Sequence, residues 1–274
     1  MWFFRSGPVV PVLRFAGPIG MVTPLRPGIS MSQCAGAIEK AFQMSKLPSV
    51  AVLINSPGGS PVQSSLIYKR IRSLAEEKGL PVYAFAEDVA ASGGYMIACA
   101  ADEIYADESS ILGSIGVVSA GFGFTGLIEK LGVERRVHTA GESKAMLDPF
   151  QPEKPEDVKR LKTLQKDVHA MFVELVKSRR GVVLKGSDKL LFSGEFWSGA
   201  KAVELGLADR LGDLKGVLKE RFGDKVRLVP IPTARGGLLR RLRPLSSLDA
   251  PLLPFADDLV SAVETRALWS RFGL

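Results

Sequence analysis

Short, nearly uninterrupted apolar runs alternate along the first part of the chain with segments whose apolar residues recur at helical spacing. The runs are rich in valine, isoleucine and alanine and occupy residues 9–15, 50–54 and 82–86. Runs of this length predict strands that are buried on both faces, as in a parallel sheet. Helical spacing follows Ser30 up to about Met44 and returns at residues 66–74, before Gly79. This alternation predicts a layered α/β fold with parallel strands and right-handed connections.

The same patterns predict the elements of the remaining chain. A helix of small residues is expected up to about Ala100, and a long amphipathic helix over residues 155–177. Further strands are predicted over residues 104–106, 115–119, 134–138 and 226–230, and further helices over residues 125–131, 200–205 and the segment before Phe222. We expect one domain over residues 1–232 and an appendage over residues 233–274. The appendage begins as a basic, proline- and leucine-rich linker and ends in a segment with modest helical amphipathicity.

The 274-residue chain has a formal net charge of +7, so anionic partners have to be weighed. Its arginine pairs, such as Arg135–Arg136 and Arg179–Arg180, are scattered and lack the interleaved aromatic residues of a groove for nucleic acid. We therefore expect a solvated basic surface and no nucleic-acid partner. The basic tail is the candidate for peripheral contact with an anionic membrane surface.

The cysteines favour a reducing compartment, the histidines argue against a zinc site, and the N-terminus favours a cytoplasmic location. Cys34 and Cys99 lie in apolar helical segments, so we expect no disulfide framework. His138 and His169 form no cluster that would bind zinc, and we expect neither a metal nor an organic cofactor. The residues before Arg5 are too few for the apolar region of a signal peptide. The expected location is cytoplasmic, with any peripheral contact at the inner face of the membrane.

Two glycine-rich turns follow consecutive predicted strands, at the edge where parallel sheets bind ligands. In the first, Gly58 and Gly59 would let backbone N–H groups approach a reacting carbonyl without interference from a Cβ atom. In the second, Ser92 precedes Gly93 and opens a helix, which places its hydroxyl near unpaired N–H groups. Together the turns predict a nucleophile beside an oxyanion hole. The plainer alternatives are a helix N-cap at Ser92 and a simple connection between strand and helix.

A serine hydroxyl needs an adjacent base to become a strong nucleophile. Neither histidine is well placed, because His169 lies on the long helix and His138 ends a predicted strand. A lysine is the alternative base, provided that burial keeps its amine neutral. Lys144 fits best, since it follows a predicted strand in a mostly small and apolar segment. The plainer alternative is a solvated lysine in a loop.

Four segments, in this order, resemble the signatures of serine peptidases of the signal peptide peptidase A type. They are residues 54–60 (INSPGGS), 91–95 (ASGGY), 113–117 (GSIGV) and 141–144 (GESK). A later segment, residues 202–209 (AVELGLAD), is similar to the closing segment of that family. The resemblance covers roughly residues 8–230.

The resemblance implies a ClpP/crotonase-like fold and a Ser–Lys dyad that works without a cofactor. The roles it implies are nucleophile for Ser92, general base for Lys144, hydrogen-bond partner of the lysine for Ser114, and oxyanion-hole N–H donors for Gly58 or Gly59 and Gly93. It implies an endopeptidase that hydrolyses signal-peptide-like, hydrophobic or unfolded segments, within a ring- or dome-shaped homo-oligomer. Members commonly carry a membrane anchor or signal segment before the first strand. This N-terminus shows neither, which favours the cytoplasmic location.

Three other functions are alternatives. A crotonase-type acyl-CoA enzyme would need an acid/base carboxylate, for which Glu87 and Asp88 are the candidates. A dinucleotide-binding protein is suggested by residues 121–126, which match G-x-G-x-x-G, with Glu142 at about the spacing of a ribose-binding acid. A non-catalytic interaction protein would keep the scaffold without the reaction. The ordered signatures favour the peptidase.

Overall fold

The computed structural model of the chain describes residues 7–20, 28–44, 48–233, 262–263 and 265–274. The chain forms two compact units. The sheet unit comprises residues 1–115 and 173–274, and the inserted unit comprises residues 116–172. The nucleophile and glycine turns predicted from the sequence belong to the sheet unit, whereas Lys144 belongs to the inserted unit.

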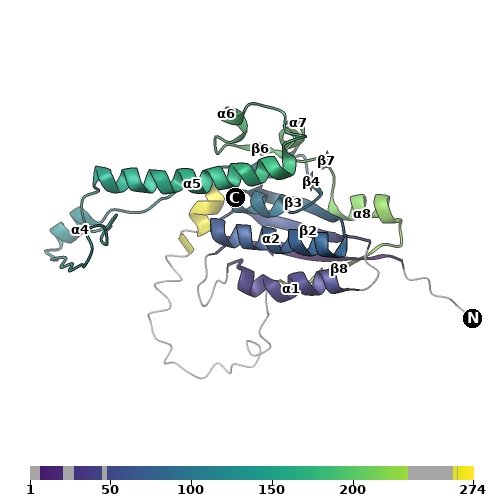
Figure 1. Cartoon of the computed structure of the whole chain (residues 1–274), viewed down its shortest axis with the longest axis horizontal. Helices are drawn as coiled ribbons and strands as arrows, with labels where there is room; N and C mark the ends of the chain where they lie inside the picture. The colour runs from purple at the N-terminus through teal and green to yellow at the C-terminus, as the bar shows by residue number, and fades with distance from the viewer. Residues whose placement is uncertain (1–6, 21–27, 45–47, 234–261, 264) are drawn as a thin grey trace, which may run out of the picture. The chain divides into compact units, whose positions relative to one another are not determined.

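An eight-stranded sheet forms the centre of the sheet unit (Figure 1). Its strands are β1 (Val9–Ala16), β2 (Val50–Ser56), β3 (Val82–Ala91), β4 (Glu103–Ala106), β5 (Ile111–Gly113), β6 (Phe196–Ser198), β7 (Arg210–Leu211) and β8 (Arg227–Ile231). The strand order is β6-β5-β3-β2-β1-β8, and β4 pairs with both β3 and β7. Every pair is parallel except β5 with β6. The predicted layered fold with parallel strands is confirmed.

Most predicted helices are confirmed. The helices of the sheet unit are α1 (Met31–Gln43), α2 (Pro61–Lys78), α3 (Gly93–Ala98), α6 (Asp188–Leu191), α7 (Gly199–Glu204) and α8 (Leu214–Phe222). The inserted unit contains α4 (Thr125–Lys130), and α5 (Pro155–Arg180) begins in the inserted unit and ends in the sheet unit. Helices α1 and α2 lie side by side (Figure 1). Helix α2 ends at Gly79, whose left-handed φ of 61° suits a residue without a Cβ atom.

The central strands are apolar on both faces because both faces are covered. Strand β2 pairs with β1 on one side and β3 on the other, and five of its seven residues are buried. On one face, alternate residues of β1 to β4 pack against Val217 and Leu218 of α8. That cluster includes Val10, Val12, Ala51, Tyr83, Phe85 and Tyr105. Burial on this scale is the main stabilising contribution to the unit.

Strand β3 is longer than its apolar run predicts. The expected strand stops before Glu87 and Asp88, whereas β3 continues to Ala91. The register between β2 and β3 shifts near this point, and both acids find partners there. Arg14 donates to the Glu87 carboxylate at 2.9 Å, and the Asn55 amide donates to Asp88 at 2.5 Å. Because Glu87 has an ion pair and Asp88 a hydrogen bond, both carboxylates are accommodated within β3, and the strand ends directly before Ser92.

Two predicted strands are wrong. Residues 115–119 and 134–138 have no regular secondary structure, and the strand in this region is the earlier β5. Val118, Val133 and Val137 are exposed, so the valines that suggest a strand cover no core within the described part of the chain. Intrinsic β preference is weak when neither a pairing strand nor a packing surface supports it.

The predicted appendage begins at residue 233, which is the last described residue before a gap. The predicted linker lies within residues 234–261, outside the described residues. The last described segment packs against β3 within the sheet unit. Phe272 is buried against Val89 and Ala91 of β3, and Trp269 packs on the same cluster. A search of the described residues for a helix long and apolar enough to cross a membrane finds none.

Candidate active site

Ser92 lies in a strained turn between β3 and α3. Its φ of 51° falls in the left-handed region, which is costly for a residue with a Cβ atom. The Ser92 N–H donates to the carbonyl oxygen of Gly113 at 2.8 Å, and the Ser92 carbonyl oxygen accepts from the N–H of Met96 at 3.0 Å. Its hydroxyl makes no capping hydrogen bond to α3. The simple N-cap interpretation of Ser92 therefore lacks its defining contact, and the half-buried hydroxyl remains available for chemistry.

The two glycine-rich turns are in contact, as the sequence predicts. A Cβ atom added to Gly58 would lie 2.7 Å from the Cβ of Ser92 and 2.9 Å from the nitrogen of Gly93. A Cβ atom on Gly59 would lie 2.1 Å from the carbonyl oxygen of Ile19. Both positions also have positive φ, 100° and 141°. Glycine is therefore required at Gly58 and Gly59 for two independent reasons.

The backbone N–H groups of this site differ in their partners. The N–H of Gly58 donates to the hydroxyl oxygen of Ser56 at 3.2 Å. Among the described residues, no hydrogen bond engages the N–H of Gly59 or of Gly93. Free N–H donors beside a nucleophile are what an oxyanion hole requires. The N–H groups of Gly59 and Gly93 are thus unengaged among the described residues, whereas that of Gly58 already has an acceptor.

Ser114 lies at the end of the neighbouring strand. Strands β3 and β5 pair Ala91 with Gly113, so the residues that follow them, Ser92 and Ser114, leave the sheet at the same edge. Ser114 is buried and has a φ of 51°. Its backbone N–H donates to the backbone carbonyl oxygen of Glu195 at 2.7 Å. The structure therefore brings five of the six predicted site residues together within the sheet unit.

Lys144, the sixth predicted residue, lies in a turn of the inserted unit. Its N–H donates to the carbonyl oxygen of Gly141 at 3.2 Å, and its side chain is exposed in the chain. The turn is attached to the first turns of α5, where Arg160 donates to the hydroxyl of Ser143 and Asp157 accepts the N–H of Leu147 at 3.3 Å. Within the described part of the chain, Lys144 therefore does not lie in the apolar, buried setting that its proposed role as a base requires.

The alternatives lose structural support. The G-x-G-x-x-G match at residues 121–126 needs a strand before it, and the predicted strand at residues 115–119 is absent. Glu87 and Asp88, the carboxylates considered for a crotonase-type reaction, are engaged by Arg14 and Asn55.

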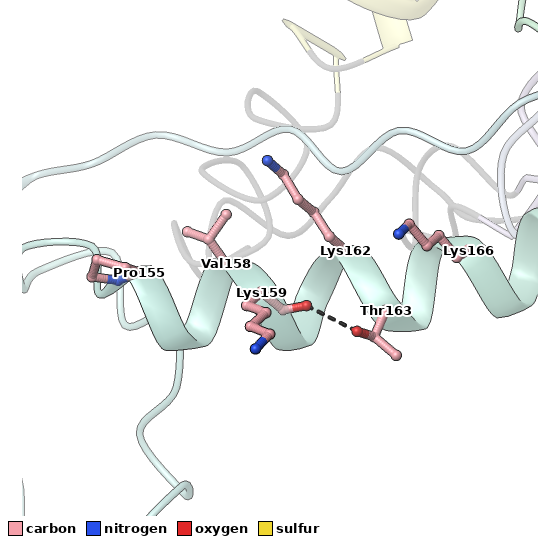
Figure 2. Close-up of a pocket in the computed structure, with 6 residues that line it drawn as sticks. All are labelled: Pro155, Val158, Lys159, Lys162, Thr163 and Lys166. Carbon is pink, nitrogen blue, oxygen red and sulfur yellow. Dashed lines mark hydrogen bonds between the residues drawn. The ribbon is translucent and has the colours of Figure 1, made fainter.

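A hollow along α5 lies apart from these residues in the sequence. Its volume is ≈ 380 Å³, and it is lined by Pro155, Val158, Lys159, Lys162, Thr163 and Lys166. Figure 2 shows Val158 and Lys162 projecting from one side of the helix, and Lys159 and Thr163 from the other. The Thr163 hydroxyl donates to the carbonyl oxygen of Lys159 at 3.1 Å. The lining contains no nucleophile paired with a base, so the hollow has no share in the predicted chemistry.

Sequence reasoning missed a buried polar network next to α3. The hydroxyl of Tyr95 donates to the carbonyl oxygen of Leu207 at 2.8 Å. Arg180, the last residue of α5, pairs with Asp209 at 2.7 Å. The only signal in the sequence was the AVELGLAD segment, whose aspartate is Asp209 and whose role in the pairing is invisible without the fold.

Comparison with protein families gives a match to peptidase family S49 over residues 75–225. The chain is 53% identical over 272 residues to the Na⁺/H⁺ antiporter NhaA of Brucella abortus, covering 97% of this chain and 37% of that protein. It is 33% identical over 210 residues to the chloroplastic serine protease SPPA of Arabidopsis thaliana, covering 75% of this chain and 31% of that protein. The chain thus spans about a third of the length of each of these two relatives.

A solved structure supports the fold. A membrane-bound stomatin-specific protease, determined with a substrate peptide, superposes with a TM-score of 0.50 at 15% identity. The superposition covers 92% of this chain and 99% of that chain. The predicted ClpP/crotonase-like fold is confirmed.

Proposed function

The chain belongs to peptidase family S49, and from this membership we propose that it is a serine endopeptidase with Ser92 as nucleophile and Lys144 as general base. The observation that carries the proposal is the turn at Ser92. A strained serine with an uncapped hydroxyl lies against Gly58 and directly before Gly93, and among the described residues no hydrogen bond engages the N–H groups of Gly59 and Gly93. This arrangement supports a nucleophile next to an oxyanion hole.

The reaction follows from these groups. The neutral amine of Lys144 takes the proton from the Ser92 hydroxyl as its oxygen attacks the peptide carbonyl carbon. The oxyanion that forms accepts hydrogen bonds from the N–H groups of Gly59 and Gly93, and losing one such donor costs about 3 kcal/mol in other enzymes. The lysine then gives its proton to the departing amine, which leaves an acyl-enzyme ester. A water molecule deprotonated by the same lysine then attacks the ester carbonyl carbon, and the bond to the Ser92 oxygen breaks as that oxygen takes the proton back from the lysine. Ser114 orients the lysine amine by a hydrogen bond.

We propose unfolded or hydrophobic peptide segments, including those like signal peptides, as substrates. An endopeptidase needs an extended chain, because the scissile carbonyl has to reach the N–H donors of a turn. Tyr95 and Met96 follow the nucleophile but are buried in the core, so they do not select substrate side chains directly. The antiporter activity named for the Brucella relative is not part of this proposal, because the match covers 37% of that protein.

A homo-oligomer is the second part of the proposal. The inserted unit exposes large apolar side chains, including Phe122 at 74%, Leu131 at 67% and Val118 at 66%. Apolar surface gathered in one segment is typical of an interaction surface. A second copy of the chain covering it would also supply the burial that Lys144 needs as a base. Peripheral membrane contact through the basic tail is a further part of the proposal, and most of that tail lies outside the described residues.

The test combines covalent labelling with peptide hydrolysis. The wild type should react with a fluorophosphonate at Ser92 and cleave an unfolded, internally quenched peptide. Ser92→Ala should abolish both, and Lys144→Ala should lower hydrolysis at least about 10³-fold. Lys130→Ala is the matched control, because Lys130 is another exposed lysine of the inserted unit and should leave the rate unchanged. Hydrolysis that survives Ser92→Ala or Lys144→Ala, with assembly intact, contradicts the mechanism.

A further inference from the structure

Helix α3, which begins directly after Ser92, is short and enclosed. It has six residues, and all of them are buried. A helix of this length is not stable by itself. Ser92 at its start also holds a positive φ, which persists only where the surrounding structure fixes it. The placement of the nucleophile therefore depends on contacts that hold α3 in the sheet unit.

Tyr95 provides such a contact one turn after the nucleophile. Its ring is fully buried, and its hydroxyl donates a 2.8 Å hydrogen bond to the carbonyl oxygen of Leu207. Burial raises the pKa of Tyr95 well above its usual value, so the hydroxyl keeps its proton and remains a donor throughout the working pH range. The bond joins the helix of Ser92 to a segment more than one hundred residues later in the sequence.

Arg180 holds that later segment in place. Its guanidinium donates to the carbonyl oxygen of Gly206 at 2.9 Å and to the two carboxylate oxygens of Asp209 at 2.7 and 3.0 Å. The Asp209 carboxylate also accepts the N–H of Ile104 of β4 at 2.7 Å. The Arg180 side chain is 4% exposed and the Asp209 side chain 23%, so the guanidinium side of this bidentate pair is shielded from water. Leu207 lies between the two residues that Arg180 binds.

We propose that Tyr95, Arg180 and Asp209 are positioning residues for the Ser92 nucleophile. The inference rests on the proposed function, because it assumes that Ser92 is the reacting group. The Arg180–Asp209 pair fixes the Leu207 carbonyl, and that carbonyl fixes the Tyr95 hydroxyl. Through Tyr95 the network fixes the rotation of α3 about its axis and the direction in which Ser92 presents its hydroxyl. A small misplacement of a reacting group lowers rates strongly, so the network should affect kcat more than KM.

The sharpest test is Tyr95→Phe, which removes one hydroxyl and no ring. The rate of fluorophosphonate labelling at Ser92 and the kcat for peptide hydrolysis should both fall roughly 10-fold, with KM changed less than about two-fold. The matched control is Tyr105→Phe. Tyr105 is also fully buried and its hydroxyl is also hydrogen-bonded, to Glu103 and Arg221, but it lies on β4 and does not contact α3 through this hydroxyl. The melting temperature of the Tyr105→Phe variant should fall by about as much as that of Tyr95→Phe, while its rate of labelling at Ser92 stays unchanged.

A double variant tests whether the contacts act as one chain. Arg180→Lys keeps the charge and loses the bidentate fork, so it should also slow labelling per folded molecule. If Arg180 acts through Tyr95, the variant carrying both changes should label no more slowly than the slower single variant. If the double variant instead slows labelling by the product of the two single effects, Arg180 acts independently of Tyr95. That result contradicts its positioning role.

The outcomes separate this inference from the proposed function. A wild type that is not labelled at Ser92 overturns both. A wild type that is labelled, with Tyr95→Phe labelled at the same rate, overturns the inference alone. Slower labelling in Tyr95→Phe and equally slow labelling in Tyr105→Phe also overturns it, because the effect would then be general destabilisation.

Discussion

Ser92 and Lys144 lie in regions of the molecule that are built in opposite ways. The residues from Ser92 to Ala101 are almost all buried, and the turn is fixed by hydrogen bonds to Gly113 and to the helix that follows. The residues from 116 to 150 are almost all half-buried or exposed. Their ion pairs include that of Arg136 with Glu134, whose side chains are 74% and 69% exposed. Surface ion pairs of this kind contribute little to stability.

The difference indicates what each region needs in order to work. The sheet unit supplies the strained turn, the free N–H donors and the buried network from its own chain. The inserted unit offers an exposed lysine and several exposed apolar side chains. The sheet unit therefore holds its half of the proposed site in buried surroundings, and the inserted unit is where we propose that a second copy binds. The following predictions test that contrast.

After the Ser92 and Lys144 variants, the largest functional effect is expected at Gly58. Gly58→Ala places a Cβ atom 2.7 Å from the Cβ of Ser92 at a φ of 100°, so the two turns have to separate. Labelling of Ser92 and peptide hydrolysis should fall at least about 10²-fold. Gly121→Ala in the inserted unit is the control, since a Cβ atom there meets nothing within 4 Å. Equal rates in the two variants would show that the turn at Gly58 is not part of the site.

The next effect concerns stability. Leu218 of α8 is 0% exposed, and Leu218→Ala should lower the free energy of unfolding by about 3 kcal/mol through lost burial and a cavity. Leu131 of the inserted unit is 67% exposed, and Leu131→Ala should cost less than about 0.5 kcal/mol in dilute solution. Urea unfolding at low protein concentration measures both. A large loss for Leu131→Ala would mean that the inserted unit is covered within the single chain.

Thiol reactivity sharpens the contrast further. Burial raises the pKa of Cys99 to about 12 and that of Cys34 to about 11. Since only the thiolate reacts, at pH 8 both should be alkylated at least about 100-fold more slowly than in urea. Their rates should rise with pH up to these raised pKa values. The burial of neutral thiols stabilises the fold fully below the ordinary pKa, and this contribution is lost as pH rises towards the folded value.

The control for reactivity is Val133→Cys, which places a thiol at an exposed position of the inserted unit. Iodoacetamide should alkylate that thiol at pH 8 at nearly the unfolded rate, as mass spectrometry would show. Rapid native alkylation of Cys34 or Cys99 would mean that the sheet unit opens far more readily than its packing indicates.

The sequence predicts the sheet unit much better than the inserted unit, and the reason is burial. The run at residues 50–54 is apolar because β2 is enclosed, so the pattern and the structure have one cause. The valines at residues 117–118 and 137 give the same pattern without an enclosing core, and the predicted strands there are wrong. Strand β6 is not predicted because three residues are too few to show an alternation of apolar and polar side chains. It forms by pairing with β5.

The candidate site divides in the same way. Ser92, Gly58 and Gly93 were identified from local motifs, and the fold brings them into contact because the carboxyl ends of parallel strands share an edge. The Arg180–Asp209 pair joins residues 29 positions apart, which no local period links. The catalytic roles, and above all the pairing of Ser92 with Lys144, stay predictions that labelling and mutation have to test.

The smallest expected effect is on self-association. Phe122→Asp puts a charge where a second copy is proposed to bind, and should raise the dissociation constant of the oligomer about 10-fold or more, equal to about 1.4 kcal/mol. Val62→Asp is the control, because Val62 is 64% exposed on α2 of the sheet unit, where no partner is proposed. Light scattering across a dilution series gives both constants. If the wild type is monomeric at all concentrations, or if both variants dissociate alike, the inserted unit is not the surface that a second copy covers.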